Sequence, residues 1–250
     1  MHEKSHSLTI DLCIVLGRRP DLLQRTLESF ERDVFPNFVF QNVFVNIDPI
    51  FGTEQDERDC MHLVKLCFPS AHFFRPEKPG FCAAVKRLWS HTLSDYVFHL
   101  EDDWVALDRL DKQLMEPFHD PHVMQVSFHT ADQHWDIARK GHLHQRNEYA
   151  RVFGVNIPLF RKFPKFTTSP SVLRGDFARQ AAGLMDETRD PEKQFYSGVN
   201  APLERLAKPN KNFIFSPQQK PVIRDIGREW RDNCRIKKVV QDATSIWVSE

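Results

Sequence analysis

Residues 8–104 alternate between short apolar runs and segments whose apolar side chains recur at helical spacing. A short apolar run is typical of a buried strand, whereas apolar residues three and four positions apart form one face of a helix. This alternation favours parallel strands joined by crossover helices. The expected strands are residues 8–16, 42–48, 71–75 and 96–100, and the expected helices are residues 21–30, 56–68 and 80–93.

Charged residues stand where these strands end. Arg18 and Arg19 follow the first strand, Asp48 ends the second, and the acidic triplet at residues 101–103 follows the fourth. The carboxyl ends of parallel strands line one crevice, where ligands bind. Three adjacent carboxylates repel one another, and a divalent cation that carries a nucleotide diphosphate would relieve this repulsion. The alternative is a solvated acidic turn, but the recurrence of charge at successive strand ends favours a ligand site.

After the triplet the pattern is less regular. We expect a helix at residues 107–118, a strand at 122–128 and a long polar loop at 130–150. A helix at residues 176–185 is expected to begin with Asp176 as its N-cap, because a carboxylate there accepts hydrogen bonds from the first free N–H groups. Further expected elements are a helix within residues 190–206 and strands at residues 212–215 and 222–226.

Charge is distributed unevenly along the 250 residues, although the formal net charge is zero. Residues 1–150 contain 16 basic and 23 acidic residues, which gives a net charge of −7. Residues 151–250 contain 18 basic and 11 acidic residues, which gives a net charge of +7. A basic part beside an acidic site suits an anionic ligand held between them. The alternative is that the two parts simply complement each other electrostatically.

Composition indicates an ordinary globular protein of the cytoplasm. The apolar stretches are short and interrupted by charge, so we expect neither a transmembrane segment nor a signal peptide. The five cysteines are widely spaced and form no CxxC pair, which predicts free thiols in a reducing compartment.

Several ordered segments resemble the GT-A-fold glycosyltransferases, nearest in style to the family-2-like enzymes. CIVLGRRPDLLQRTLESF, at residues 13–30, resembles their first strand and helix, and Asp48 stands where they carry an acid after strand two. RPEKPGFCAAVKRLWSHTLSDYVFHLEDDW, at residues 75–104, resembles the helix and strand that deliver their acidic, DxD-type metal motif, here EDD. SPSVLRGDFAR, at residues 169–179, resembles their acceptor-side region more weakly.

This resemblance implies an α/β, Rossmann-type, mostly parallel sheet flanked by helices. It implies one domain over residues 1–250, in which residues 8–104 form the nucleotide-sugar-binding half. Residues 105–250 then form the acceptor-side half, with a basic C-terminal tail. The implied activity is metal-dependent transfer of a sugar from a nucleoside-diphosphate sugar, in first place a UDP-sugar, to an acceptor hydroxyl.

The resemblance also assigns roles to the acidic triplet. Asp103 becomes the direct ligand of Mn²⁺ or Mg²⁺, since hard cations prefer carboxylate and phosphate oxygens. Glu101 and Asp102 become contacts to the donor ribose or to the water molecules of the metal ion. Asp48, together with Arg18 or Arg19, becomes the candidate contact to the nucleotide base and ribose.

Three departures from the family pattern bear on the donor site. No Asn precedes Gly80, and Lys86 replaces a later Asn, which makes Lys86 a further donor-binding candidate. Many relatives supply a late His to the metal, but this chain has no His after His144. Either carboxylate, phosphates and water alone hold the metal, or a cationic side chain substitutes.

A direct displacement needs a general base near the acceptor hydroxyl. Residues 185–195 concentrate acids, and the resembling enzymes place an acid there under the acceptor pocket. Glu192 is the favoured base and Asp190 the second choice, although ordinary helix-capping roles would explain both. A base of this kind favours inversion of the anomeric centre.

Arg228 and Arg231 are candidates for a loop that closes on the diphosphate, or else belong to a basic surface helix.

Two other classes of function compete with sugar transfer. A nucleotidyltransferase would normally carry a Gly-rich, basic phosphate loop after the first strand, and the corresponding segment here is only GRRP. A non-catalytic module that binds carbohydrate or nucleic acid would use the basic C-terminal part, but the acidic triplet would repel a phosphate backbone unless a metal intervenes. For the transferase, the expected acceptor is a glycan, and a hydroxylated base in DNA is the second possibility.

Overall fold

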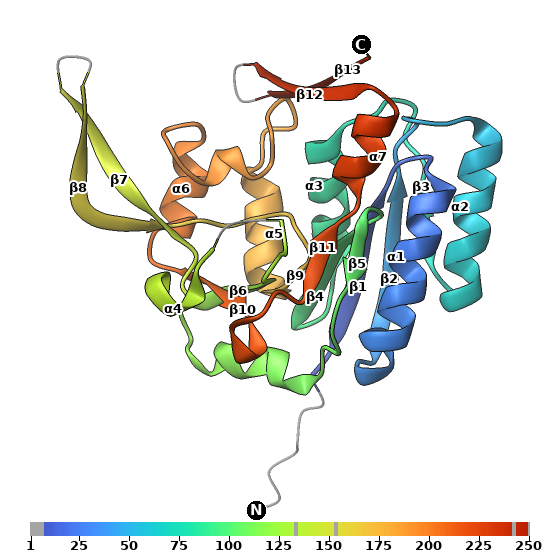
Figure 1. The fold of residues 1–250 in the computed structure, drawn as a ribbon, viewed down its shortest axis with the longest axis horizontal. Coiled ribbons are helices and arrows are strands. Elements are labelled where there is room, and N and C mark those ends of the chain that lie inside the picture. Colours follow the sequence, from blue (N-terminus) through green and yellow to red (C-terminus); the bar gives the residue numbers. More distant parts are fainter. Residues whose placement is uncertain (1–7, 133–134, 153–154, 242–243, 250) are drawn as a thin grey trace, which may run out of the picture.

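A seven-stranded sheet forms the centre of the protein, and its strands follow the order β3-β2-β1-β4-β9-β6-β10 (Figure 1). The computed structural model describes residues 8–132, 135–152, 155–241 and 244–249. The antiparallel strand β9 separates β4 from β6, and the other neighbouring strands run parallel. The predicted α/β class with a mostly parallel sheet is therefore confirmed. The strand bounds are β1 Ile10–Leu16, β2 Phe40–Ile47, β3 His72–Phe74, β4 Tyr96–Glu101, β6 Val123–Phe128, β9 Ser171–Arg174 and β10 Lys211–Phe215.

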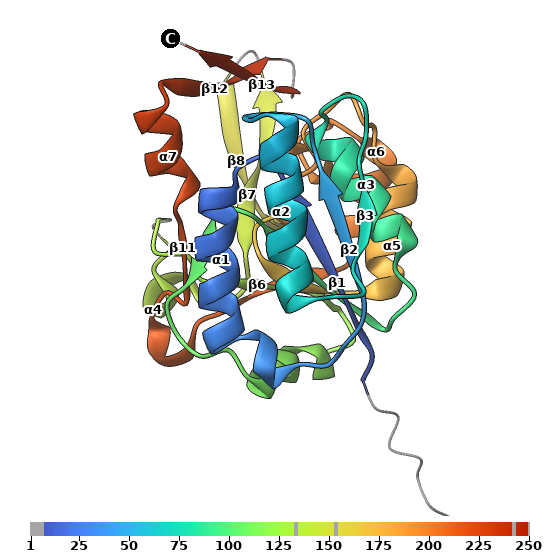
Figure 2. The same cartoon turned by 90° about the vertical axis from the view of Figure 1, so that its right-hand side faces the viewer.

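Helices cover both faces of the sheet (Figures 1 and 2). Helices α1 (Pro20–Asp33) and α2 (Glu54–Cys67) pack side by side on one face, and α3 (Phe81–His91) and α5 (Gly175–Leu184) pack on the other. Pro20 suits the first turn of α1 because that turn needs no N–H from it. Thr53 caps α2 in a reciprocal capping box with Asp56.

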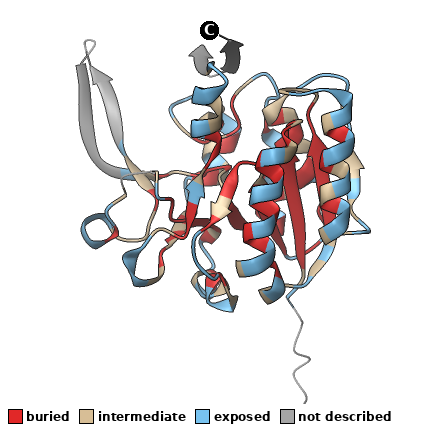
Figure 3. Ribbon diagram, turned by 45° about the vertical axis from the view of Figure 1, so that its right-hand side comes forward, coloured by how far each residue is buried: buried red, intermediate tan, exposed pale blue. Residues whose placement is uncertain are grey.

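The sheet separates two hydrophobic cores. One core packs Leu27 and Phe30 of α1 and Val64 of α2 against the strands. The other packs Trp89 of α3 and Phe177 of α5 against the opposite face. Figure 3 shows the buried strands between helices whose outer faces are exposed. Because apolar side chains cover β1 and β4 on both faces, the polar groups at their carboxyl ends are held in fixed positions.

Smaller elements surround the carboxyl edge of the sheet. Strand β5 (Trp104–Ala106) pairs antiparallel with β11 (Ile223–Asp225), and α7 (Gly227–Asn233) follows β11 directly. The remaining strands form two hairpins, β7 (Gln145–Val152) with β8 (Val155–Pro164) and β12 (Ile236–Gln241) with β13 (Thr244–Ser249). The short helices are α4 (Ile137–Lys140), α6 (Ala201–Ala207) and 3₁₀ turns at Phe35–Asn37, Lys112–His119, Lys193–Phe195 and Pro217–Gln219.

Three expectations about local structure were wrong. The helix expected at residues 107–118 is a 3₁₀ helix at Lys112–His119, and it contains Pro117, which cannot donate a backbone hydrogen bond. Asp176 is not an N-cap, because α5 already begins at Gly175, which lies so close to the Ser94 carbonyl that any Cβ there would collide with it. The loop expected at residues 130–150 contains α4 and most of β7.

No helix in the described part of the chain has both the length and the apolar character that crossing a bilayer requires.

Asp11 anchors the start of the central strand pair. Its side chain is fully buried in β1, and its Oδ1 accepts hydrogen bonds from the side chains of Asn42 and Ser94, at 2.8 Å each. Asp11 also accepts from the backbone N–H groups of Leu93 and Ser94, at 2.7 and 3.0 Å. These bonds connect the amino ends of β1 and β2 to the turn that precedes β4.

We expect Asp11→Ala to lower the free energy of unfolding by about 3 kcal/mol, because it leaves several buried donors without a partner. Urea denaturation followed by circular dichroism measures this loss. Glu116→Ala, which removes an exposed carboxylate, is the control and should change the unfolding free energy by less than about 0.5 kcal/mol. Equal stability of the two variants would contradict the assignment.

Candidate functional site

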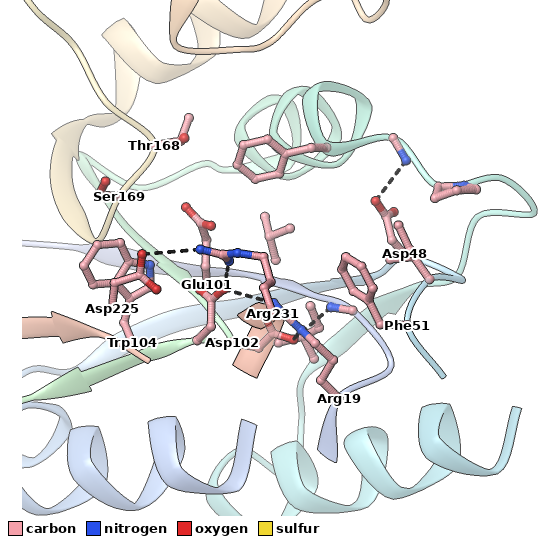
Figure 4. A pocket seen from close by; sticks show the side chains of 18 of the residues that line it. Arg19, Asp48, Phe51, Glu101, Asp102, Trp104, Thr168, Ser169, Asp225 and Arg231 are labelled. Atoms are coloured by element: carbon pink, nitrogen blue, oxygen red, sulfur yellow. Dashed lines mark hydrogen bonds and ion pairs between the residues drawn. The ribbon is translucent and has the colours of Figure 1, made fainter. Parts of the chain in front are cut away.

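A cavity of about 570 Å³ lies at the carboxyl ends of β1, β2 and β4 (Figure 4). Such a volume is typical of sites for small ligands. Seven carboxylates and three arginines contribute to its lining, so it carries many charged side chains. These ten residues are Asp48, Glu101, Asp102, Asp103, Asp190, Glu192, Asp225, Arg19, Arg228 and Arg231.

Arg19 is the buried centre of the site. Its guanidinium donates to both oxygens of Asp102 and, at 3.2 Å, to Oδ2 of Asp103. The guanidinium also lies over the rings of Phe51 and Trp230, 5.0 and 5.2 Å from the ring centroids. A planar guanidinium can pair with a carboxylate and stack on aromatic rings at the same time, which a lysine cannot do equally well.

The charges of Arg19 and the acidic triplet stabilise one another. Burial by itself lowers the pKa of Arg19, but Asp102 and Asp103 more than compensate, and the pKa lies above its ordinary value. Burial raises the pKa of Asp103; Arg19 and Arg231 oppose this shift and Asp102 adds to it. Asp102 is held further by the backbone N–H of Gly17, which donates to Oδ2 at 3.0 Å.

The segment after β11 lies on Asp103. The backbone N–H of Ile226 donates to the Asp103 carbonyl oxygen at 2.8 Å. Arg231 Nη1 donates to Asp103 Oδ2 at 3.4 Å, and Arg231 Nη2 lies 3.7 Å from Asp225 Oδ2. Arg228 Nε donates to the same Asp225 oxygen at 3.1 Å. Figure 4 shows Arg231 between Asp225 and the triplet.

A strand pairing and a glycine permit this close approach. Antiparallel pairing of β5 with β11 places Asp225 directly opposite Trp104, the residue after Asp103. Gly227 then passes so near that a Cβ at this position would collide with the Asp103 carboxylate. Glycine is therefore required at position 227 for contact with the triplet.

Asp48 forms another wall of the cavity. Its carboxylate accepts hydrogen bonds from the Asn46 side chain at 2.7 Å and from the backbone N–H of Gly80 at 2.9 Å. Burial raises the pKa of Asp48 above its ordinary value, and the bonds from Gly80 and Asn46 oppose this shift. Nearby, the backbone of Phe51 has a positive φ of 71°. This conformation is unfavourable for a bulky side chain, and such strained conformations are often found at functional sites.

Glu192 and Asp190 line the cavity from the C-terminal part of the chain. Glu192 Oε1 accepts hydrogen bonds from the Thr167 hydroxyl and from both the N–H and the hydroxyl of Thr168. Asp190 Oδ1 accepts from the backbone N–H groups of Glu192 and Lys193, at 3.1 and 3.3 Å. Asp190 thus orders the turn that presents Glu192, and Thr167 and Thr168 fix one oxygen of the Glu192 carboxylate.

The carboxylates of the cavity do not form a complete cage for a metal ion. Among the described residues, no three His, Cys, Asp or Glu side chains gather around one point. Mg²⁺ and Mn²⁺ at nucleotide sites are commonly held by one or two carboxylates together with phosphate oxygens and water. Asp103, with Glu101 and Asp225 also in the lining, fits an ion of this kind that shares its coordination shell with a bound diphosphate.

Most of the residues singled out from the sequence lie together. Nine of them line the cavity: Arg19, Asp48, Glu101, Asp102, Asp103, Asp190, Glu192, Arg228 and Arg231. Two do not. Arg18 Nη2 pairs with Glu57 at 2.6 Å, and Lys86 Nζ lies 3.2 Å from Glu187 and donates to the Met185 carbonyl at 3.1 Å. The functional roles of all eleven residues stay predictions.

Sequence reasoning missed other lining residues. Asp225 lies three residues before Arg228, which the sequence analysis names as a candidate, so its position was the available signal. Phe51, Thr168 and Ser169 also line the cavity. No local pattern marks them, because their place in the site depends on the β2–α2 loop and on the segment before β9.

Comparison with known proteins supports the fold. Neither a family model nor a curated protein matches the sequence. Among solved structures, that of GalNAc-T7 with UDP, GalNAc and Mn²⁺ superposes with a TM-score of 0.57 at 14% identity, covering 90% of this chain and 45% of that one. S. aureus TarS superposes with a TM-score of 0.51 at 12% identity, covering 91% and 38%. The chain thus spans less than half the length of either protein, and it has the GT-A fold that the resemblance predicts.

We expect Arg19→Met to lower the free energy of unfolding by about 3 kcal/mol at neutral pH, because it leaves two adjacent buried carboxylates without their main counter-ion. The folded pKa of Asp103 is already raised above 3.8 and would rise further without Arg19. Ionisation of Asp103 therefore costs stability, and the loss should shrink as the pH falls through this raised pKa.

Urea denaturation at a series of pH values between 4 and 7 measures the effect. Arg25→Met, which removes an exposed arginine from the same helix, is the matched control. A loss that is independent of pH, or equal in the two variants, would show that Arg19 does not neutralise the triplet.

Proposed function

We propose that this protein is a glycosyltransferase that moves a sugar from a nucleoside-diphosphate sugar to an acceptor hydroxyl. The observation that carries the proposal is the composition of the cavity. An acidic triplet and three arginines meet at the carboxyl edge of the sheet, and Glu192 lines the same cavity. Arginines suit a diphosphate, and the carboxylates suit ribose hydroxyls and a hard cation.

The donor lies, in this proposal, with its base and ribose toward Asp48 and Phe51 and its diphosphate toward Asp103, Arg228 and Arg231. Asp48 can accept a hydrogen bond from a base or ribose, and the Phe51 ring can stack on a base. We favour a UDP-sugar because the GT-A-fold neighbour GalNAc-T7 was solved with UDP, GalNAc and Mn²⁺. A nucleotide sugar is also compatible with a cavity of about 570 Å³.

Asp103 is the proposed protein ligand of a Mn²⁺ or Mg²⁺ ion. The bound cation would neutralise the negative charge that develops on the departing nucleoside diphosphate. Glu101 and Asp102 have supporting roles in this proposal. Glu101 contacts the donor ribose or a water molecule bound to the metal ion. Asp102 holds Arg19, which in turn donates to Asp103.

Glu192 is the proposed general base. The acceptor oxygen attacks the anomeric carbon as its proton passes to Glu192, and the bond from that carbon to the diphosphate breaks. Because Thr167 and Thr168 bind Oε1, the carboxylate is oriented and Oε2 can face the acceptor. A single displacement of this kind inverts the anomeric centre. Asp190 positions the turn and is the second candidate for the base.

A glycan is the proposed acceptor, with a hydroxylated DNA base as the second possibility. The reaction is proposed to occur in the cytoplasm, and the five free cysteines support a reducing compartment.

The proposal is tested by screening nucleotide sugars for thermal stabilisation with Mn²⁺, followed by an assay of donor hydrolysis and of product. We expect one donor to stabilise the protein and to be turned over only with a divalent cation. Asp103→Asn should remove metal-dependent turnover and keep the fold. Full activity of Asp103→Asn would reject the metal assignment. Release of pyrophosphate from a nucleoside triphosphate would instead identify a nucleotidyltransferase.

Replacing Glu192 by Gln should reduce transfer about 100-fold or more, because a general base contributes on this order to the rate. Donor binding should stay unchanged, since the Gln carbonyl oxygen can still accept the threonine hydrogen bonds. Turnover and calorimetric donor affinity are both measured. Glu187→Gln, a change to an exposed acid in the same region, is the control. Full transfer activity in Glu192→Gln would exclude Glu192 as the base.

A further inference from the structure

Asp103 has two cationic partners, Arg19 and Arg231, which come from different parts of the fold. Arg19 is fixed: it pairs with both oxygens of Asp102, lies against two aromatic rings, and has a side chain that is only 8% exposed. These contacts exist whether or not Arg19 also touches Asp103. Arg19 is therefore a permanent part of the site.

Arg231 reaches Asp103 from a helix outside the sheet. Its contacts to the carboxylates of Asp103 and Asp225 are long, at 3.4 and 3.7 Å, and its side chain is 18% exposed. It belongs to α7, a helix of seven residues from which Arg228 and Arg231 line the cavity. Because α7 lies outside the sheet, a change of partner by Arg231 would leave the sheet undisturbed.

Both guanidiniums donate to the same oxygen, Asp103 Oδ2. A divalent ion coordinated by this oxygen would stand close to Arg231 and repel it in this partly buried site. The charge of Arg19 is already balanced by its pairing with Asp102. A diphosphate beside the ion would remove the conflict, because it offers Arg231 oxygen acceptors of higher charge. The arginine and the ion can then both be neutralised.

We propose that Arg231 exchanges partners: it is the counter-ion of Asp103 in the free protein and pairs with the donor diphosphate once the donor is bound with its metal ion. This inference rests on the proposed function, because it assigns the regulation of that same site. Arg231 thereby makes Asp103 a poor ligand for a free divalent ion. Metal and nucleotide should therefore bind with strong positive cooperativity, each raising the affinity for the other by the same factor.

Mn²⁺ binding in the absence of nucleotide tests the exchange directly, without any activity measurement. Arg231→Gln removes the competing cation, so the affinity of the protein for Mn²⁺ alone should rise by about five- to tenfold. The affinity for UDP at saturating Mn²⁺ should instead fall by about tenfold, because the diphosphate loses a charged partner. Electron paramagnetic resonance of free Mn²⁺ and titration calorimetry with UDP measure the two quantities.

Two further variants serve as controls. Arg224→Gln removes an equal charge from an exposed position on the adjacent β11 and should change neither affinity. The double variant Arg231→Gln/Asp103→Asn should lose the gain in Mn²⁺ affinity, which assigns that gain to Asp103.

The outcomes separate this inference from the proposed function. Unchanged or weaker Mn²⁺ binding by Arg231→Gln overturns the exchange, and so does a gain that persists in the double variant. If no nucleotide or nucleotide sugar binds the wild-type protein with Mn²⁺, the proposed function fails, while the comparison with Mn²⁺ alone still decides whether Arg231 competes for Asp103.

Discussion

The contact between Arg19 and the Asp102–Asp103 pair governs the organisation of the site. Adjacent carboxylates at the end of a buried strand are unstable unless a cation accompanies them, and Arg19 supplies that cation from the end of β1, the neighbouring strand. Phe51, in the β2–α2 loop, and Trp230, in α7, enclose its guanidinium from two distant parts of the chain. One buried ion-pair network thus connects the sheet, the β2–α2 loop and α7.

The C-terminal segment completes this network. Pairing of β11 with β5 directs the chain across the triplet, and Gly227 allows the backbone to approach the Asp103 carboxylate. The result is a site whose acids are already partly neutralised before any ligand arrives. If the proposed donor, with its diphosphate, binds here together with a metal ion, the positive charge of the ion offsets the negative charge of the diphosphate. The pair then disturbs the balance between the arginines and the carboxylates of the site less than either would alone.

Local patterns predicted the first half of the chain well and the second half less well. Strands β1, β2 and β4 and helices α1 to α3 have strong periodicity, and they occur where expected. The 3₁₀ helix at Lys112–His119 and the start of α5 at Gly175 depend on a proline and on a close approach to Ser94, which periodicity does not describe. Nine predicted residues line the cavity, but Arg18 and Lys86, which have similar chemistry, lie elsewhere.

The sequence by itself determined the alternating α/β order, the placement of charges at strand ends, and hence one polar edge of the sheet, because these properties follow from periodicity and from the direction of parallel strands. Only the tertiary structure decided which of two adjacent arginines enters the cavity, that Arg231 meets Asp103, and that Thr167 and Thr168 orient Glu192. Those contacts join residues 24 to 128 positions apart, and such pairings depend on sheet register and loop geometry, which no local pattern specifies.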